Sequence, residues 1–351
     1  MQAVTRLIWL VLAGCGTSGP AAGDASAPHD AAELEASGLD AGVDAPVPRW
    51  SLDTSSVTVS GISSGGFMAV QFHVAFSSLV KGAAIFAGGP YMCSKGSVAT
   101  ALTTCAGGSP APDVSASVAA TNANAAAGDI DPTSGLQDAR IFLFVGADDD
   151  VVNPVVVDAL QSYYAALLPS ASIAYVNRRA GTAHTWPTLD YGVPCDIVSS
   201  PYVGKCSYDG AGAALAQLYG TLAPASASLG GQIVAVPQGA FIADPAAHSL
   251  DDTAYAYVPA ACASGDACKL HIAFHGCLQG ASSVGDAFYA HAGLDEWADA
   301  NHLVVLYPQA IKSGANPEGC WDFWGYDSPD FAKKSGPQMA MVRAMIDGIA
   351  K

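Results

Sequence analysis

Positive charge is scarce in this chain of 351 residues. Lysine and arginine together number 14 against 31 aspartates and glutamates, so the formal net charge is −17. So few cations cannot neutralise a row of phosphates, which excludes nucleic acid as a partner. The same shortage excludes electrostatic attraction to an anionic membrane surface. A neutral or weakly charged substrate suits this composition, and acidity that only aids solubility is the alternative explanation.

The N-terminus has no apolar run long enough to span a bilayer. Arg6 gives a short basic start, residues 7–12 are apolar, and Cys15 ends a Leu-Ala-Gly-Cys sequence. Such a segment predicts a signal peptide and not an anchor helix. Leu-Ala-Gly-Cys resembles the bacterial lipobox, whose cysteine is acylated; Gly16 after it implies the outer membrane in a Gram-negative lipoprotein. We expect a lipoprotein-type signal peptide over residues 1–15, with an ordinary signal peptide and an incidental Cys15 as the alternative.

Aromatic residues are missing from residues 16–48, which are rich in Ala, Asp, Ser, Gly and Pro. Such a segment cannot bury enough apolar surface to offset its ordering entropy, so we expect a flexible tether. Behind a lipidated Cys15 it would hold a folded domain off a membrane. We therefore expect an exported monomer, either lipid-anchored at the outer membrane or cell surface or secreted. Its membrane contact would be through the lipid alone.

Paired CxxC motifs are also missing, and the cysteine spacings do not resemble zinc sites. His271 and His275 lie four apart, but in a stretch typical of a strand, which makes a poor metal-binding face. We expect no metal. Without Cys15, eight cysteines remain, and an even number in an exported chain suggests disulfides. Proximity in the sequence suggests four local pairs: Cys93 with Cys105, Cys195 with Cys206, Cys262 with Cys268, and Cys277 with Cys320.

From Trp50 onward, apolar runs alternate with Gly-rich turns and Ala-rich stretches. Runs typical of buried strands cover residues 57–59, 83–86, 141–145, 173–176, 270–274 and 303–307. Stretches typical of helices cover residues 66–80, 155–168, 211–219, 286–301 and 338–349. This alternation predicts an α/β fold, a mostly parallel central sheet flanked by helices, in one catalytic domain over residues 49–351. Residues 229–257 fit a β-hairpin that leads into the later strands.

Residues 61–65, Gly-Ile-Ser-Ser-Gly, match the pattern G-x-S-x-G. A β-rich stretch leads into the match and a helical stretch leads out of it. Strand, sharp turn and helix together expose a serine at the top of a sheet. The centre of the pattern is Ser63, the predicted nucleophile, and the N–H of Ser64 would face the developing oxyanion. The alternative is a Gly-Ser loop before a helix, with one of the serines as N-cap.

A serine nucleophile needs a base, and the base needs an acid that orients it. In α/β-hydrolases both follow the serine, the acid first and the histidine second. The apolar run 141–145 leads into an acidic loop with three neighbouring aspartates, and the spacing from Gly146 favours Asp149 as the acid. A solvated acidic turn and a calcium loop are the alternatives. A carboxylate in this loop would lie at the same edge of the sheet as the serine.

The predicted base is His184. It lies in Gly-Thr-Ala-His-Thr-Trp-Pro, directly after the run 173–176, and follows Ser63 and Asp149 in the chain. Histidines in a loop after a late strand are where this fold places its base. An ordinary surface histidine is the alternative. The order of the three residues is what favours catalysis.

A His-Gly turn, His275-Gly276-Cys277, ends the run 270–274. It resembles the oxyanion loop of esterases, whose backbone N–H groups point at the substrate carbonyl. The usual order puts that loop before the nucleophile, whereas here it lies far behind. The order therefore predicts a circularly permuted α/β-hydrolase, with Cys277 giving its N–H and a disulfide to Cys320 holding the loop rigid. A buried structural turn without a catalytic part is the alternative.

Seven motifs occur in one order: Gly-Ile-Ser-Ser-Gly-Gly-Phe-Met-Ala, Phe-Ala-Gly-Gly-Pro-Tyr, Ala-His-Thr-Trp-Pro-Thr, Cys-Ser-Tyr-Asp-Gly-Ala-Gly, Phe-His-Gly-Cys-Leu-Gln-Gly, Tyr-Pro-Gln-Ala and Gly-Cys-Trp-Asp-Phe. From about Val57 to the C-terminus the chain resembles the circularly permuted polyhydroxybutyrate depolymerases of the fungal single-domain type. The resemblance implies disulfides and a triad of Ser63, Asp149 and His184. It also implies an oxyanion hole from the N–H groups of Ser64 and Cys277.

The resemblance implies a serine esterase that hydrolyses poly(3-hydroxybutyrate) or related polyesters and oligomers through an acyl-enzyme, without metal or organic cofactor. The family's Cys-Trp-Asp-Trp is Cys-Trp-Asp-Phe-Trp at residues 320–324 here, so we expect a different substrate cleft, with Trp186, Trp321 and Phe323 as its candidate lining. A polyvinyl-alcohol hydrolase or a feruloyl or aryl esterase on the same scaffold is one alternative. A catalytically inactive surface binding lipoprotein is another.

Overall fold

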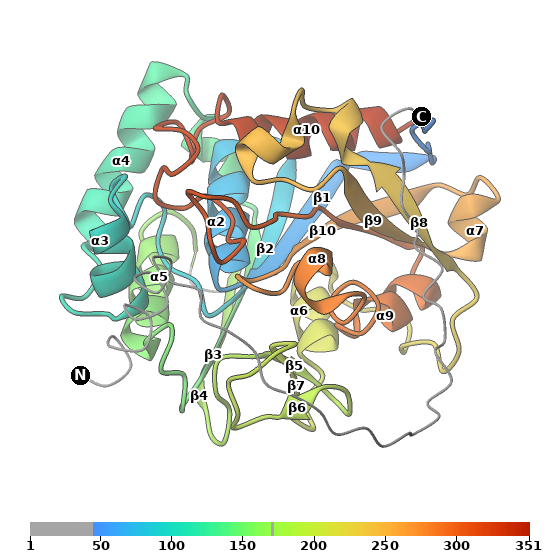
Figure 1. The fold of residues 1–351 in the computed structure, drawn as a ribbon, viewed down its shortest axis with the longest axis horizontal. Coiled ribbons are helices and arrows are strands. Elements are labelled where there is room, and N and C mark those ends of the chain that lie inside the picture. Colours follow the sequence, from blue (N-terminus) through green and yellow to red (C-terminus); the bar gives the residue numbers. More distant parts are fainter. Residues whose placement is uncertain (1–44, 170–171) are drawn as a thin grey trace, which may run out of the picture.

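The computed structural model describes residues 45–169 and 172–351 (Figure 1). The predicted signal peptide, the lipidation of Cys15 and residues 16–44 of the predicted tether lie outside the described residues. Within those residues, no helix combines the length and the apolar character that a bilayer crossing requires.

An eight-stranded sheet forms the centre of the molecule, in the order β4-β3-β2-β1-β10-β11-β9-β8. Strands β4 to β11 in this order are parallel, whereas β9 runs antiparallel to both of its neighbours. The strands are β1 (Leu52–Ile62), β2 (Val80–Phe86), β3 (Arg140–Gly146), β4 (Ile173–Arg179), β8 (Gln232–Pro237), β9 (Thr253–Val258), β10 (Cys268–Phe274) and β11 (Leu303–Tyr307). The six predicted strands are confirmed, and the predicted hairpin is present as β8 and β9.

Strand β1 comes first in the chain but lies in the middle of the sheet (Figure 1). Its Gly61 pairs with Ile85 of β2 on one side and with Phe274 of β10 on the other. One half of the sheet is thus built from the strands that follow directly, and the other half from the end of the chain. This arrangement confirms the predicted circularly permuted α/β-hydrolase fold.

Helices cover both faces of the sheet because successive side chains of each strand point to opposite faces. Val57 and Val59 of β1 belong to the core under α2 (Ser64–Ala75), α5 (Pro154–Ala165) and α10 (Pro337–Ile349). Strand residues such as Ala84 and Phe142 belong to the opposite core, under α6 (Gly210–Tyr219) and α9 (Leu294–Ala300). Three α-helices are only three or four residues long: α3 (Val98–Thr100), α7 (Ala260–Ala263) and α8 (Ala281–Val284).

Two helices differ from the prediction. The stretch 286–301 is helical only at α9, because Gly293 directly before it takes a left-handed conformation with φ 79°. Helix α4 (Val114–Ala127) was not predicted, since its Ala-rich sequence has no apolar period. Asp113 caps it by accepting a hydrogen bond from the N–H of Ala116 at 3.0 Å.

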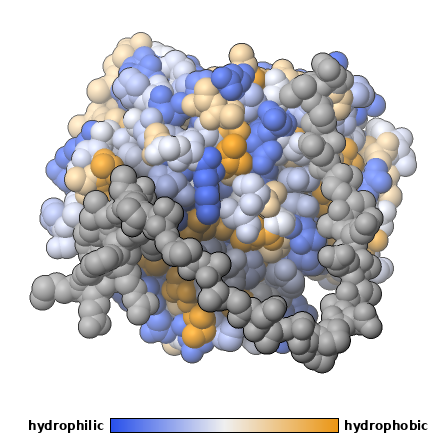
Figure 2. Space-filling model, viewed as in Figure 1, coloured by the Kyte–Doolittle hydropathy of each residue, from blue (hydrophilic) through white to orange (hydrophobic). Residues whose placement is uncertain are grey.

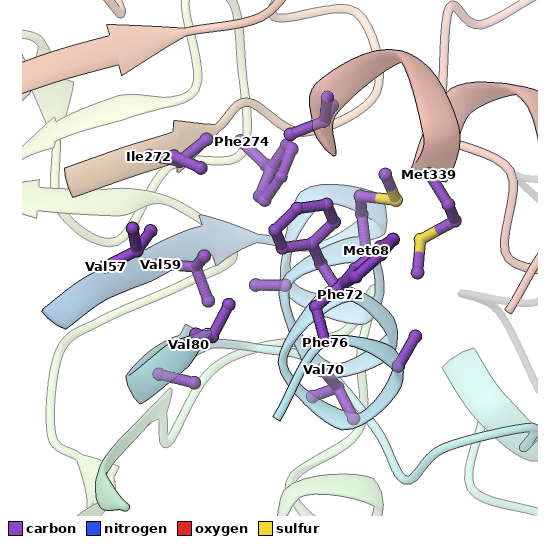
Figure 3. Packing of buried hydrophobic residues seen from close by; sticks show 14 of the residues in the cluster. Val57, Val59, Met68, Val70, Phe72, Phe76, Val80, Ile272, Phe274 and Met339 are labelled. Atoms are coloured by element: carbon purple, nitrogen blue, oxygen red, sulfur yellow. The ribbon is translucent and has the colours of Figure 1, made fainter. Parts of the chain in front are cut away.

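Helix α2 lies between the sheet and α10, and all twelve of its residues are buried. Figure 3 shows Met68 and Phe72 of α2 facing Phe274 of β10 and Met339 of α10. Close packing on all sides fixes the position of the N-terminus of α2, which follows directly after Ser63. On the outer surface, in the part that the described residues form, apolar and polar residues are interspersed (Figure 2).

A small sheet follows the His184 segment, in the order β5-β7-β6, with β5 (Trp186–Thr188), β6 (Val193–Pro194) and β7 (Val203–Lys205). The disulfide Cys195–Cys206 closes it. The other three disulfides are Cys93–Cys105, Cys262–Cys268 and Cys277–Cys320. The expected disulfides are confirmed in the pairing that sequence proximity suggested, and four of them are typical of a protein that folds in an oxidising compartment.

Candidate active site

Ser63 occupies a strained turn between β1 and α2. Its backbone has φ 57° and ψ −125°, a conformation that non-glycine residues rarely adopt. A Cβ on Gly61 would lie 2.1 Å from the carbonyl oxygen of Gly65, and one on Gly65 would lie 2.3 Å from the carbonyl oxygens of Phe274 and His275. Neither position can carry a side chain, so both glycines of the G-x-S-x-G pattern are required by the close approach of the backbone.

Ser64 is the first residue of α2, so its N–H lies in the turn of the helix where no intrahelical acceptor exists. A helix N-terminus also carries partial positive charge, which stabilises an anion. The Ser64 hydroxyl accepts a hydrogen bond from the N–H of Trp321 at 3.3 Å. Its side chain is therefore a structural contact, and its backbone N–H is the candidate donor to an oxyanion.

Asp149 lies in the loop after β3 and is only 5% exposed, whereas the neighbouring Asp148 and Asp150 are exposed. Its Oδ1 accepts hydrogen bonds from the N–H groups of Val151 at 3.1 Å and Val152 at 2.8 Å. These bonds fix the orientation of the carboxylate. Among the three aspartates that the sequence offered, Asp149 is the one that points inward.

Asp149 and His184 form a buried pair. Nδ1 of His184 lies 2.9 Å from Oδ2 and 3.1 Å from Oδ1 of Asp149. A carboxylate only accepts hydrogen bonds, so the Nδ1 of a neutral His184 carries the proton and donates it to Asp149. Nε2 then keeps its lone pair, which is the form that a general base requires.

Backbone hydrogen bonds join the carboxyl ends of β1, β2, β3 and β4 and the residues that follow them; Ser63, Asp149 and His184 come after three of these strands. The bonds are Ser63 N–H to Phe86 O at 3.0 Å, Ala87 N–H to Phe144 O at 2.9 Å, Ala147 N–H to Arg179 O at 2.8 Å, and Asp148 N–H to Thr182 O at 3.0 Å. Since these strands are parallel, their carboxyl ends form one edge of the sheet, where α/β proteins place their sites. Ser63, Asp149 and His184 all follow strands at this edge.

The turn His275-Gly276-Cys277 follows β10 at the same edge. His275 donates from Nδ1 to the carbonyl oxygen of Gly276 at 2.7 Å and accepts at Nε2 from the N–H of Ala310 at 3.0 Å. Burial lowers the pKa of His275 to about 4, so its ring is neutral at neutral pH. The histidine of the predicted oxyanion loop thus holds the turn in shape.

Gly276 brings this turn against Ser63, because a Cβ on Gly276 would lie 3.3 Å from Cβ of Ser63. Its own N–H is bonded to Oε1 of Gln279 at 2.8 Å, and that of Leu278 to the carbonyl oxygen of Glu318 at 2.7 Å. The N–H of Cys277, between them, has no acceptor within residues 45–169 and 172–351. Together with the N–H of Ser64, it supplies two donors suited to an oxyanion.

The predicted aromatic lining is wrong at two of its three positions. Trp186 and Trp321 have no exposed surface. Trp186 donates from Nε1 to the carbonyl oxygen of Ala292 at 2.8 Å, and Trp321 packs edge-on against Phe274, with ring centroids 5.2 Å apart. Large indole rings gain more from burial than from a half-exposed position. Phe323 is half-buried and stacks on Phe67 with centroids 4.4 Å apart.

A cavity of about 700 Å³ adjoins the oxyanion turn, which the sequence did not predict. Leu278, directly after Cys277, forms part of its wall, and Tyr202, Leu250, Asp252, Ile311 and Lys312 form others. Its residues come from four separate segments, so no local motif marks it. In the described part of the chain, no group of three or more His, Cys, Asp or Glu side chains is arranged to hold a metal ion.

Two curated proteins are similar to this chain. A poly(3-hydroxybutyrate) depolymerase of Delftia acidovorans is 42% identical over 309 residues, which cover 87% of this chain and 61% of that protein. A polyhydroxybutyrate depolymerase of Talaromyces funiculosus is 36% identical over 321 residues, which cover 86% of this chain and 92% of that protein. The matched region thus spans less than two thirds of the Delftia protein and nearly all of the Talaromyces protein. No family profile matches the chain.

Two solved structures share the fold. The crystal structure of PHB depolymerase from Penicillium funiculosum superposes with a TM-score of 0.80 at 36% identity, covering 87% of this chain and 98% of that one. A serine-to-alanine variant of PHB depolymerase in complex with an R3HB trimer superposes with a TM-score of 0.81 at 35% identity and the same coverage. At this identity and coverage the likeness extends over the whole of the described domain.

Proposed function

This chain belongs to the polyhydroxybutyrate depolymerase family of carboxylic ester hydrolases, and from that premise we propose that it hydrolyses poly(3-hydroxybutyrate) or a related polyester through an acyl-enzyme on Ser63. The observation that carries the proposal is the buried Asp149–His184 pair, 2.9 Å between Nδ1 and Oδ2, at the sheet edge where the strained Ser63 turn lies. Relatives that act on this polymer and a related structure with a bound R3HB trimer support the substrate class.

In the first half of the reaction, Oγ of Ser63 attacks the ester carbonyl and Nε2 of His184 takes the hydroxyl proton. Asp149 accepts the Nδ1 hydrogen bond throughout and stabilises the imidazolium that forms. The N–H groups of Ser64 and Cys277 bind the negative oxygen of the tetrahedral intermediate. As the ester bond breaks, His184 returns the proton to the departing alkoxide, which leaves as the hydroxyl end of a shortened chain.

In the second half, water attacks the acyl-enzyme and gives up its proton to His184. The tetrahedral intermediate is again held by the same two N–H groups, and Ser63 leaves with the proton from His184. The other product is a chain with a free carboxylate. The net charge of −17 does not repel a neutral polyester, and it favours the departure of the acidic product.

The test is the release of 3-hydroxybutyrate from amorphous poly(3-hydroxybutyrate) by wild type and Ser63→Ala side by side. We expect release by the wild type alone. Release by both variants would refute Ser63 as the nucleophile. If the wild type releases no 3-hydroxybutyrate but hydrolyses nitrophenyl or feruloyl esters, the substrate is an ester other than this polymer. Cleavage of oxidised polyvinyl alcohol would identify that hydrolase instead, and failure of a fluorophosphonate to label Ser63 would leave only a binding protein.

We also propose that the protein is exported, which the four disulfides support. Acylation of Cys15 stays a prediction from the lipobox resemblance. Mass spectrometry of the mature N-terminus decides it, because an unmodified residue other than Cys15 at that end would refute the anchor.

A further inference from the structure

Gln279 is a buried amide that the proposed mechanism does not use. Its side chain is 1% exposed. Oε1 accepts a hydrogen bond from the N–H of Gly276 at 2.8 Å, and Nε2 donates to the carbonyl oxygens of Tyr202 at 2.9 Å and Pro201 at 3.3 Å. One end of the amide therefore meets a donor and the other end meets two acceptors. Only an uncharged group with one acceptor and one donor atom satisfies this environment.

The Oε1 end holds the oxyanion turn. Gly276, whose N–H it binds, packs against Ser63, and the next N–H along the chain is that of Cys277. The bond from the Gly276 N–H to Gln279 orients the peptide plane before Gly276. The plane after it, which carries the Cys277 N–H, is held at the Gly276 carbonyl oxygen, which accepts from Nδ1 of His275 at 2.7 Å and from the backbone N–H of Gln279 at 3.3 Å. Gln279 therefore bonds both peptide planes that flank Gly276, and the direction of the Cys277 N–H depends on Gln279 together with His275.

The Nε2 end holds the segment that follows the general base. The carbonyl oxygen of Tyr202 accepts a second hydrogen bond, from the N–H of Trp186 at 2.9 Å. Trp186 lies two residues after His184. Tyr202 itself has φ 60°, a conformation that is unfavourable for a residue with a large side chain and that needs support from its surroundings. Two donors on one carbonyl oxygen, Gln279 and Trp186, give this support.

We propose that Gln279 is a positioning residue that couples the oxyanion turn to the loop of the general base, so that donor and base keep their geometry relative to Ser63. This inference rests on the proposed function. The segments that Gln279 joins lie 77 residues apart in the chain, between Tyr202 and Gln279. Efficient acyl transfer requires the nucleophile, base and oxyanion donors to be held within a fraction of an ångström. A single buried amide that bonds the oxyanion turn directly, and the backbone of Trp186 through the carbonyl oxygen of Tyr202, supplies part of that constraint.

The decisive variant is Gln279→Glu, which keeps the shape of the side chain. Near pH 8 its carboxylate would face two carbonyl oxygens in place of an N–H donor, so we expect kcat for a nitrophenyl ester to fall at least about tenfold, with a much smaller change in KM. A protonated carboxyl group has one O–H donor and one carbonyl acceptor, like the amide. The ratio of variant to wild-type kcat should therefore rise as the pH falls through the pKa of the new group. A ratio near one at pH 8, or one that does not change with pH, would overturn the proposal.

Gln238→Glu is the matched control. Gln238 is also fully buried, accepts from the N–H of Gln309 at 3.0 Å, and donates to the carbonyl oxygens of Asp251 at 2.6 Å and Gln309 at 2.8 Å. It joins the ends of β8, β9 and β11. We expect it to lower the melting temperature while the kcat of the folded protein stays within about twofold of wild type. Equal losses of kcat in both variants would show a general effect of a buried charge, against our proposal.

A readout without catalysis separates this proposal from the proposed function. Gln279→Met removes all three side-chain hydrogen bonds without adding charge, and we expect faster amide hydrogen exchange in two segments together, residues 275–279 and 184–188. Faster exchange in residues 275–279 alone would refute the coupling. A wild type that hydrolyses no ester would refute the proposed function, and the exchange measurement would still decide whether the two segments are coupled.

Discussion

Strand β1 carries Ser60 inside the sheet and leads into Ser63 just beyond its end, and the two serines lie in different surroundings. The hydroxyl of Ser60 is hydrogen-bonded to Nε2 of His271 at 2.8 Å, and both residues are fully buried. Nδ1 of His271 bonds the hydroxyl of Thr58 at 2.7 Å, which in turn contacts the hydroxyl of Tyr219 at 2.5 Å. This cluster has the serine–histidine contact of an esterase, and two of its residues, Thr58 and Ser60, lie on β1, the strand that leads to Ser63.

The two regions differ in the group that the histidine Nδ1 contacts and in the burial of the serine. Both ring nitrogens of His271 face hydroxyls, whereas Nδ1 of His184 faces the carboxylate of Asp149. Burial lowers the pKa of His271 to about 3, so it cannot take a proton from Ser60 near neutral pH. Strand geometry also keeps Ser60 in the core, while the turn at Ser63 lifts its side chain out of it. On the proposed mechanism a serine–histidine contact is therefore insufficient for chemistry, which also needs a carboxylate and a serine that is only half-buried.

The largest effect is expected from the two serines themselves. Ser63→Ala should lower kcat/KM for a nitrophenyl ester by about 10⁴-fold or more, because the attacking oxygen is lost. Ser60→Ala should leave kcat/KM within about twofold and lower the free energy of unfolding by about 1–2 kcal/mol, the cost of one unsatisfied buried partner. Ester hydrolysis and urea unfolding measure the two quantities. The comparison fails if Ser60→Ala, measured well below its unfolding midpoint, loses as much activity as Ser63→Ala.

The next largest effect concerns the carboxylate. Asp149→Asn should lower kcat by about 10³–10⁴-fold, since an amide cannot hold the tautomer in which Nε2 is the base. Asp148→Asn and Asp150→Asn are matched controls on exposed positions of the same loop, and we expect both to keep wild-type kcat. Steady-state kinetics on all three variants decides. A full loss in either control, or none in Asp149→Asn, would assign the acid to a different aspartate.

Much of this fold could be predicted from the sequence because its signals are local. Apolar runs located the six long strands, and the order of the serine turn and the His-Gly turn indicated the permutation. The prediction of a helix over residues 286–301 was wrong before Leu294, because Gly293 takes a left-handed conformation and the helix begins only after it. Helix α4 was also missed, because its Ala-rich sequence lacks an apolar period.

The candidate site was predictable to the same extent. Ser63, Asp149 and His184 follow strands that the sequence shows, so their placement at one edge follows from the parallel sheet. The burial of Trp186 and Trp321 depends on packing against residues more than 40 positions away, for instance on the bond from Trp186 to Ala292. The partners of Gln279 likewise come from a distant loop. Local patterns carry no information about such contacts.

The disulfides extend the comparison to the rest of the molecule. Cys277–Cys320 closes a loop with a sequence separation of 43, against 6 for Cys262–Cys268. By the chain-entropy model, replacing both cysteines by alanine should lower the free energy of unfolding by roughly 4 kcal/mol for the first pair and roughly 2 kcal/mol for the second. Only replacement of the first pair should also lower kcat, because Cys277 belongs to the oxyanion turn. Equal kcat in the two variants at a temperature where both are folded would show that the turn does not need this crosslink.

The smallest effect is the pH dependence that His271 adds to stability. Its pKa is about 3 in the folded protein against 6.5 in the unfolded chain, so below pH 6.5 the unfolded state takes up a proton that the folded state refuses. The stabilising contribution of a neutral His271 is therefore complete above pH 6.5 and is lost as the pH falls from there toward about 3. Between pH 6.5 and roughly pH 5, the stability advantage of wild type over His271→Gln should shrink by about 1–2 kcal/mol. Urea unfolding of both proteins across this range measures the difference, in which the contributions of the other titrating groups cancel. A constant difference would mean that His271 is protonated in the folded state, and the contrast with His184 would then rest on the carboxylate and on access alone.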